Sequence, residues 1–127
     1  MKIIGVGLDL VDLSRFATLY LDDQDVLDRC FTPTEQLEAG AGAHRAGRLA
    51  ARFAAKEAVF KSMGGDAEIA HTDIEILREP TGAPRAVLHN RAQSRASALG
   101  VGQIMLTLTH SDGAAAAVAI AVSSDPR

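Results

Sequence analysis

Apolar and other residues alternate near the N-terminus, which predicts a first β-strand. The even positions of this segment are apolar: Ile4, Val6, Leu8 and Leu10. The odd positions are Gly5, Gly7 and Asp9. A period of two is typical of a strand that buries one face, here the even one. Glycine weakens a strand, so the two glycines indicate that something approaches the backbone closely at this point.

Residues 48–64 have the pattern of one long helix, because alanines and long side chains dominate the segment and Gly64 and Gly65 follow it. Four residues form its apolar stripe: Leu49, Phe53, Phe60 and Met63. Glu57 and Lys61 lie on one side of this stripe. Cations occupy the other side: Arg48, Arg52 and Lys56. A helix that only packs on a core does not need these charges, so the pattern favours one that holds a metal ion and a polyphosphate.

Two shorter helices are predicted from their end signals. Residues 32–35, Thr-Pro-Thr-Glu, form a capping box with proline at the first helical position, and this helix ends near Gly40. Asn90 is the predicted cap of a second helix, which has Ala92, Ala96 and Leu99 on one face and stops at Gly100.

Two hairpins complete the pattern. Ile74 and Ile76 are predicted to pair with Ala86 and Leu88 across a turn at 79–84. A strand over 104–109 runs into His110, and a turn at 111–113 leads into a strand over 114–122. Because helices and hairpins are segregated along the chain, the pattern favours an α+β fold over a parallel α/β sheet.

Each candidate chemical group also has an ordinary structural interpretation. Asp9, beside the glycines, could ligate a hard cation, or it could merely cap the next helix, a role for which Asp12 and Ser14 compete. Glu57 and Lys61 could be only the i,i+4 pair that stabilises exposed helices. His110 is either a turn residue, or a proton carrier or hydrogen-bond donor to a phosphate.

Composition narrows the class of protein. The chain of 127 residues has the length of one domain, 1–127, and a net charge of −3. This charge and the lack of interleaved basic and aromatic residues argue against nucleic acid as a partner. The lone Cys30 allows no internal disulfide, which fits a cytoplasmic location. No apolar run reaches the length of a membrane span, and Met1-Lys2 leads directly into the first strand.

The motifs, in this order, closely resemble the holo-acyl-carrier-protein synthases, which are small trimeric 4′-phosphopantetheinyl transferases. Two motifs are specific: residues 5–11 with Arg15 following, and residues 52–58 extended through Lys61 to Gly64. Four others support them: residues 31–35, 73–76, 82–84 and 108–111. The resemblance implies the fold of that family, a mainly antiparallel sheet with a long central helix, assembled as a trimer.

The resemblance also implies a reaction and a set of site residues. Asp9 and Glu57 would hold Mg²⁺, with Mn²⁺ as the alternative, on the pyrophosphate of coenzyme A, and Lys61 would contact the phosphates. Arg52, Gly64 and His110 would line the coenzyme A site. A carrier-protein serine would attack the β-phosphorus, taking phosphopantetheine and releasing 3′,5′-ADP. Whether a metal-bound water or one carboxylate removes the serine proton stays open.

The partners implied are coenzyme A, an acyl carrier protein or carrier domain, and two further copies of the chain. The alanines Ala50 and Ala54 and the run 114–117 favour close backbone packing, which an oligomer interface would provide. No membrane partner is expected. The competing hypothesis is a non-catalytic module that binds a nucleotide or anion or assembles a complex.

One segment departs from the family. Many relatives carry a helix rich in arginine and lysine after the first motif, whereas residues 21–29 of this chain contain four aspartates: Asp22, Asp23, Asp25 and Asp28. Like charge across an interface slows association. We therefore expect poor transfer of phosphopantetheine to a strongly acidic discrete carrier protein. We expect the dedicated substrate to be a carrier domain of a multifunctional fatty-acid synthase. The alternative is a solvated face that never meets the partner.

Overall fold

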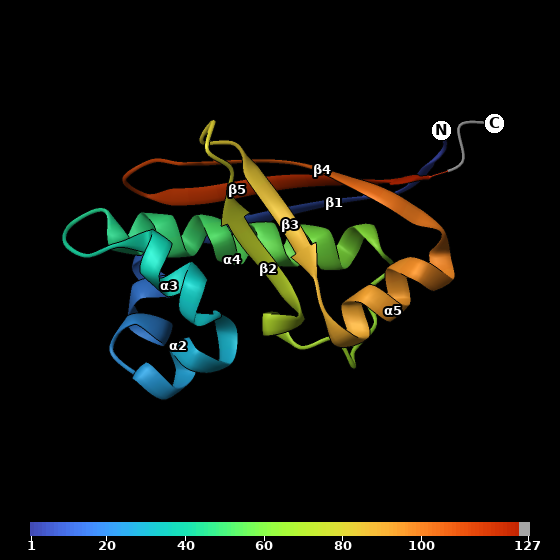
Figure 1. Cartoon of the computed structure of the whole chain (residues 1–127). Helices are drawn as coiled ribbons and strands as arrows, with labels where there is room; N and C mark the ends of the chain where they lie inside the picture. Colours follow the sequence, from blue (N-terminus) through green and yellow to red (C-terminus); the bar gives the residue numbers. More distant parts are fainter. Residues whose placement is uncertain (125–127) are drawn as a thin grey trace.

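One long helix, α4 (Arg45–Ser62), lies between two antiparallel sheets in this computed structural model, which describes residues 1–124. The larger sheet has the order β1-β5-β4 and consists of β1 (Ile3–Asp12), β5 (Ala114–Ser123) and β4 (Val101–His110). The smaller sheet is the hairpin of β2 (Ile74–Arg78) and β3 (Pro84–Leu88). In Figure 1 the larger sheet lies above α4, and the hairpin crosses in front of the helix. The predicted α+β class with antiparallel pairing is confirmed.

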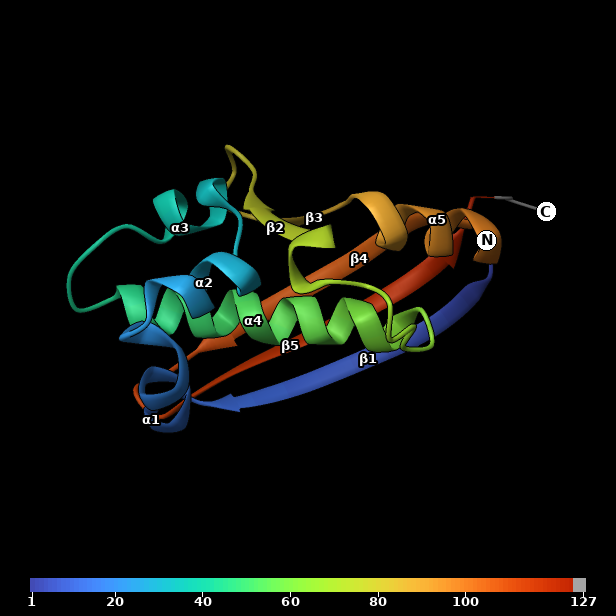
Figure 2. The ribbon, with the colours of Figure 1, turned by 90° about the horizontal axis from the view of Figure 1, so that it is seen from below.

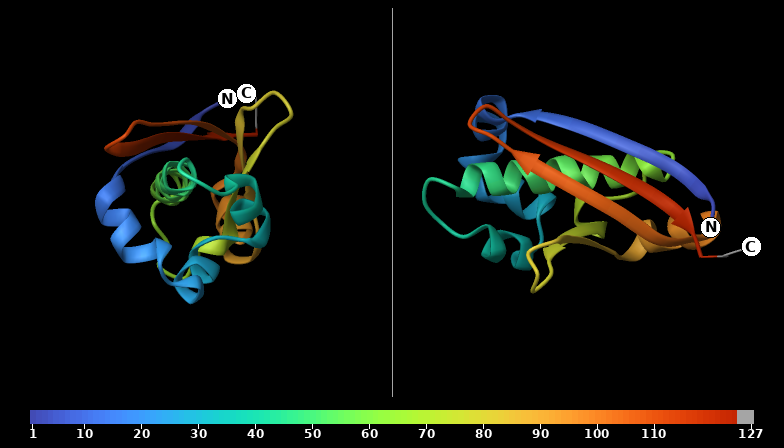
Figure 3. Two further views of the ribbon diagram at one scale, coloured as in Figure 1. Left: turned by 90° about the vertical axis from the view of Figure 1, so that its left-hand side faces the viewer. Right: turned by 90° about the horizontal axis from the view of Figure 1, so that it is seen from above.

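Short helices surround the long one. Those before it are α1 (Leu13–Phe16), the π-helical turn η1 (Ala17–Leu21), α2 (Gln24–Cys30) and α3 (Pro33–Ala39). Those after it are the 3₁₀ turn η2 (His71–Asp73) and α5 (Asn90–Leu99). Figure 2 and Figure 3 show α2 and α3 near the N-terminal half of α4 and α5 near its C-terminal end. The short helices α2 and α3 therefore lie beside the N-terminal half of the long helix that follows them.

The predicted end signals locate the helices closely. The capping box of α3 is present: Thr32 N donates to Glu35 Oε1 at 2.8 Å, and Glu35 N donates to the Thr32 hydroxyl at 3.2 Å. The helix stops at Gly40, as predicted. For α5 the prediction is off by one residue, because His89 occupies the cap position and Asn90 is the first helical residue. The long helix begins three residues earlier than predicted, at Arg45, and ends at Ser62.

Both hairpins form as predicted. In the smaller sheet Ile76 pairs with Ala86, in the expected register. In the larger sheet His110 ends β4, and Ser111 N donates to Ala114 O at 2.8 Å across the turn. The helices of the described residues include none long and apolar enough to cross a bilayer.

Small side chains bring α4 close to the larger sheet. Buried alanines line both surfaces: Ala50, Ala51, Ala54, Ala55 and Ala58 on α4, and Ala115, Ala117, Ala119 and Ala121 on β5. The suggestion that Ala50 and Ala54 belong to an oligomer interface is wrong, because both are fully buried within the chain. The alanines instead let backbone pack on backbone within the single chain.

The prediction that β1 buries its even face is also wrong for the single chain. Val6, Leu8 and Leu10 are 58%, 61% and 72% exposed. The odd face turns inward instead, and Gly7 is buried against α4. The glycines do mark a close approach of backbone, as predicted, but the neighbour is a helix of the same chain. The even face is left as an uncovered apolar surface on the larger sheet.

Candidate active site

The carboxylates of Asp9 on β1 and Glu57 on α4 line the same pocket, whose volume is about 440 Å³. Side chains of α1 and η1 form further walls: Arg15, Phe16, Leu19 and Tyr20. Gly5 and Gly7 allow this meeting, because any side chain there would overlap the backbone of α4. Asp9 does not cap α1; Asp12 does, by accepting a hydrogen bond from Arg15 N at 2.8 Å.

Lys61 connects α4 to the end of β1 that carries Asp9. Its Nζ donates to the Leu8 carbonyl at 3.0 Å and lies 3.3 Å from Asp9 Oδ1. The ammonium is half exposed, so it remains accessible to a ligand in front of the strand. The structure thus brings together the three predicted catalytic residues, Asp9, Glu57 and Lys61.

Glu57 has a partner that the sequence did not suggest. His71, in the turn η2, places Nε2 3.0 Å from Glu57 Oε1. This hydrogen bond holds the pKa of the Glu57 carboxyl below its usual value, although burial acts in the opposite direction. The group is therefore an anion at neutral pH. No periodicity or motif relates residues 57 and 71, so the contact has no signal in the sequence.

An aromatic cluster forms one side of the pocket. The Phe16 and Tyr20 rings stack with centroids 4.9 Å apart, and Phe53 lies 5.1 Å from Tyr20. Phe53 also stacks on the His71 ring at 5.4 Å. The wall is apolar and packed, so it can exclude water from one side of the two carboxylates.

The residues of this pocket fit a hard divalent cation. Within residues 1–124 no group of three or more His, Cys, Asp or Glu side chains is arranged to hold a metal ion. Magnesium usually takes one or two protein carboxylates and completes its shell with water and substrate phosphates. Asp9 and Glu57 supply the two carboxylates, and Lys61 adds a positive charge for phosphate oxygens.

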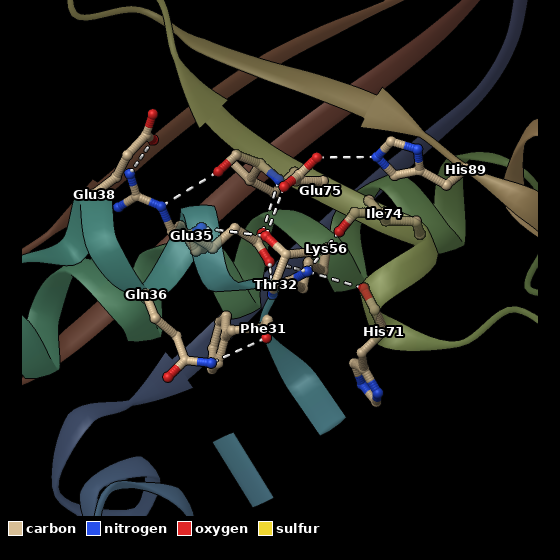
Figure 4. A network of polar contacts seen from close by, with 12 residues as sticks. Phe31, Thr32, Glu35, Gln36, Glu38, Lys56, His71, Ile74, Glu75 and His89 are labelled. Atoms are coloured by element: carbon tan, nitrogen blue, oxygen red, sulfur yellow. Dashed lines mark hydrogen bonds and ion pairs between the residues drawn. The ribbon is translucent and has the colours of Figure 1, made fainter. Parts of the chain in front are cut away.

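Two of the three cations on the other flank of α4, Arg52 and Lys56, are structural in the single chain. Lys56 is 1% exposed and pairs with the buried Glu35 at 2.8 Å. Arg52 donates to Glu38 Oε1 at 3.0 Å and to the Ile76 carbonyl at 3.3 Å. Figure 4 shows these contacts as one polar network between α3, α4 and β2. Burial lowers the pKa of the Lys56 ammonium, while Glu35 acts in the opposite direction.

The remaining predicted ligands lie outside the pocket of Asp9 and Glu57. Arg52 lines a separate pocket of about 150 Å³ together with Gly82 and Pro84. His110 is exposed at the end of β4, against Gly47 in the first turns of α4. Gly64 follows α4 with a positive φ of 83°. The single chain therefore does not unite all six predicted site residues.

Comparison with known proteins agrees with this fold. The family model of the 4′-phosphopantetheinyl transferase superfamily matches residues 5–121. A holo-[acyl-carrier-protein] synthase of Moorella thermoacetica is 44% identical over 122 residues, which cover 95% of this chain and 95% of that protein.

Solved structures give the same result. The acyl carrier protein synthase of Mycobacterium tuberculosis is 37% identical, with a TM-score of 0.73 over 96% of this chain and 99% of the other. The Bacillus anthracis enzyme, solved in complex with coenzyme A (3′,5′-ADP), is 28% identical, with a TM-score of 0.81 over 98% and 100%. The chain belongs to the 4′-phosphopantetheinyl transferase superfamily, and within it to the holo-[acyl-carrier-protein] synthases. The hypothesis of a non-catalytic module is set aside.

Proposed function

We propose that the pocket shared by Asp9 and Glu57 is the magnesium and pyrophosphate site of this holo-[acyl-carrier-protein] synthase. The observation that carries the proposal is the meeting of two carboxylates from separate elements in one pocket, with the Lys61 ammonium 3.3 Å from one of them. When bound, the cation neutralises charge on the phosphate oxygens during transfer. Lys61 supplies a second, mobile positive charge for the same oxygens.

In the proposed reaction the carrier serine oxygen bonds to the β-phosphorus of coenzyme A. The bond from that phosphorus to the bridging oxygen breaks, the electron pair stays with 3′,5′-ADP, and the serine proton is released. Arg15 and Tyr20 line the side of the pocket formed by α1 and η1, and we propose that the carrier enters from this side. Transfer of this kind depends on positioning and charge neutralisation more than on covalent chemistry by the protein.

We further propose that the enzyme is a homotrimer whose subunits meet through the larger sheet. Its outer face is uncovered and apolar, with Val6, Leu8 and Leu10 on β1 and Met105 on β4 all about half exposed or more. Neighbouring positions on β5 are small or apolar, since Leu8 pairs with Val118 and Val6 with Ile120. An exposed apolar patch of this kind is typical of a subunit interface.

The proposed trimer would bring together the predicted site residues that lie apart in a single subunit. Arg52, Gly64 and His110 are proposed to complete the coenzyme A site, with Arg52 and His110 coming from the adjacent subunit. Each subunit is proposed to be one domain, 1–127. The reduced, buried Cys30 fits the expected cytoplasmic location.

The carrier is proposed to be a domain of a multifunctional fatty-acid synthase. The four aspartates of residues 22–28 are all exposed, directly after the turn η1 that lines the pocket. Two have local structural roles, because Asp23 caps α2 and Asp28 accepts hydrogen bonds from Gln24 and Gln36. Asp22 and Asp25 project negative charge beside the proposed entry of the carrier, where an acidic partner would be repelled.

Mass spectrometry of the carrier tests the site. With coenzyme A and Mg²⁺ the carrier should gain one phosphopantetheine group per serine, and Asp9→Asn and Glu57→Gln should abolish the gain while the fold is retained. The matched control is Asp112→Asn, which changes an exposed aspartate in the β4–β5 turn outside this pocket. Full transfer by either pocket variant would refute the magnesium site.

The choice of carrier is tested by comparing initial rates. We expect faster transfer to an excised synthase carrier domain than to a discrete acidic carrier. Asp22→Lys with Asp25→Lys should raise the rate with the acidic carrier and leave the KM for coenzyme A unchanged. A clear preference of the unmodified enzyme for the acidic carrier would end this part of the proposal.

A further inference from the structure

The turn η2 provides a partner that fixes one oxygen of Glu57. His71 Nε2 lies 3.0 Å from Glu57 Oε1, and both side chains are partly shielded, 43% and 28% exposed. The imidazole is also held from the side, because it stacks on Phe53 with an interplanar angle of 20°. Phe53 and Glu57 are four residues apart on α4, so they lie on the same side of the helix. One face and one edge of the His71 ring are therefore both in contact with α4.

The backbone of the turn is fixed independently of Glu57. Lys56 Nζ donates to the His71 carbonyl at 2.9 Å and to the Ile74 carbonyl at 2.6 Å. The opposite charge on Glu35 keeps this ammonium in place. In Figure 4 the carbonyl of His71 faces Lys56, while its ring points away from the network. The ring position is thus set by a buried ion pair and not by its contact with the carboxylate alone.

We propose that His71 is a positioning residue of the cation site. Its Nε2–H holds Glu57 Oε1, so that the other carboxylate oxygen is presented in a fixed orientation to the cation shared with Asp9. A carboxylate that is already oriented loses less conformational freedom on binding a metal, and partners of metal ligands commonly change metal affinity by 10–100-fold. The inference rests on the proposed function, because it requires Glu57 to be a ligand.

The chain contains a matched control for this contact. His89 places Nε2 3.0 Å from Glu75 Oε1, and its side chain is 44% exposed. The two histidine–glutamate pairs thus have the same length and nearly the same histidine exposure. Neither His89 nor Glu75 lines the pocket of Asp9 and Glu57. A general effect of removing a surface histidine pair would appear equally at both positions.

The experiment measures Mn²⁺ affinity by electron paramagnetic resonance, with coenzyme A present and no carrier. His71→Phe keeps an aromatic ring on Phe53 but removes the donor, and should weaken Mn²⁺ binding about tenfold. His71→Gln returns a donor and should recover most of the affinity. His89→Phe should leave the affinity unchanged. In the transfer assay, His71→Phe should need about ten times more Mg²⁺ for half-maximal rate and approach the normal rate at saturation.

The results separate this inference from the function on which it rests. Unchanged or tighter Mn²⁺ binding in His71→Phe would overturn the positioning role, and so would an equal loss in His89→Phe. If Glu57→Gln itself does not weaken Mn²⁺ binding, the cation site is refuted instead. Thermal unfolding of each variant identifies any loss of affinity that comes from a loss of fold.

Discussion

Gly7 of β1 lies directly against the main-chain oxygen of Ala58 on α4, so closely that a Cβ on residue 7 would overlap that oxygen. Gly5 has the same relationship to the carbonyl of Ser62. These contacts let the strand lie on the helix backbone, and they place Asp9 in the same pocket as Glu57. The glycines therefore position the site without touching any ligand.

We expect Gly7→Ala to lower the free energy of unfolding by about 3 kcal/mol, because the neighbour is helix backbone and cannot rotate away. Transfer activity should fall as well, since relief of the overlap moves β1 away from Glu57. Gly113→Ala is the control: no atom lies within 4 Å of a Cβ at that position. Denaturant unfolding checks the difference. Equal stability of the two variants would show that the close approach of β1 to α4 is absent in solution.

The glycine pattern also shows which features of the fold the sequence of one strand can predict and which it cannot. Alternation of Val6 and Leu8 with the glycines correctly predicts a strand. It does not say which face is inside, because apolar side chains are equally suited to a core and to a subunit interface. The close approach was predictable from Gly5 and Gly7, whereas the identity of the neighbour depends on Ser62 and Ala58, which lie 57 and 51 positions further along the chain.

The buried pair of Lys56 and Glu35 leads to a second prediction. Lys56→Met removes one charge and leaves the Glu35 carboxylate buried without its partner, which should cost about 3–5 kcal/mol of stability. Adding Glu35→Gln should recover part of this loss, because it removes the unpaired charge and the amide oxygen can still accept one of the two backbone hydrogen bonds, from Ile76 N or from Thr32 N. Chemical denaturation of the single and double variants measures the recovery.

The surface pair of Arg85 and Glu79, whose side chains are 53% and 42% exposed, is the control for that cycle. Arg85→Met should change stability by less than about 1 kcal/mol. A double variant less stable than Lys56→Met alone would contradict the account, since it would mean that removing the charge of residue 35 recovers no stability.

Charge on a helix is harder to interpret from sequence than its apolar stripe. Arg52 and Lys56 have the residue types and spacing of a phosphate site, yet their partners in the chain are Glu38 and Glu35. A charged side chain pairs with whichever opposite charge the tertiary fold brings near. No periodicity in the sequence of α3 indicates that its glutamates pair with cations of α4. The capping box of α3 was predictable because its contacts are local. The second contact of Glu35, across the fold, was not.

The uncovered sheet face gives a third prediction. Leu8→Asp places a charge on the surface proposed to bury against other subunits, and should convert the trimer to monomer in sedimentation equilibrium. Leu37→Asp is a matched control, because Leu37 is 80% exposed and belongs to α3, outside the larger sheet. A monomeric unmodified protein, or a Leu8→Asp variant that stays trimeric, would refute the proposed interface.

Assembly of the site from two subunits can be tested by mixing inactive variants. Asp9→Asn and His110→Ala should each be inactive alone. If Asp9 and His110 of adjacent subunits form each site, random mixed trimers should have about a quarter of their sites intact, because half of the subunits carry each change. Activity near that fraction should appear after joint refolding. Asp9→Asn mixed with Glu57→Gln is the control: both residues line one pocket of the same subunit, so every site should stay defective. Equal recovery in both mixtures, or none in either, would place His110 outside a shared site.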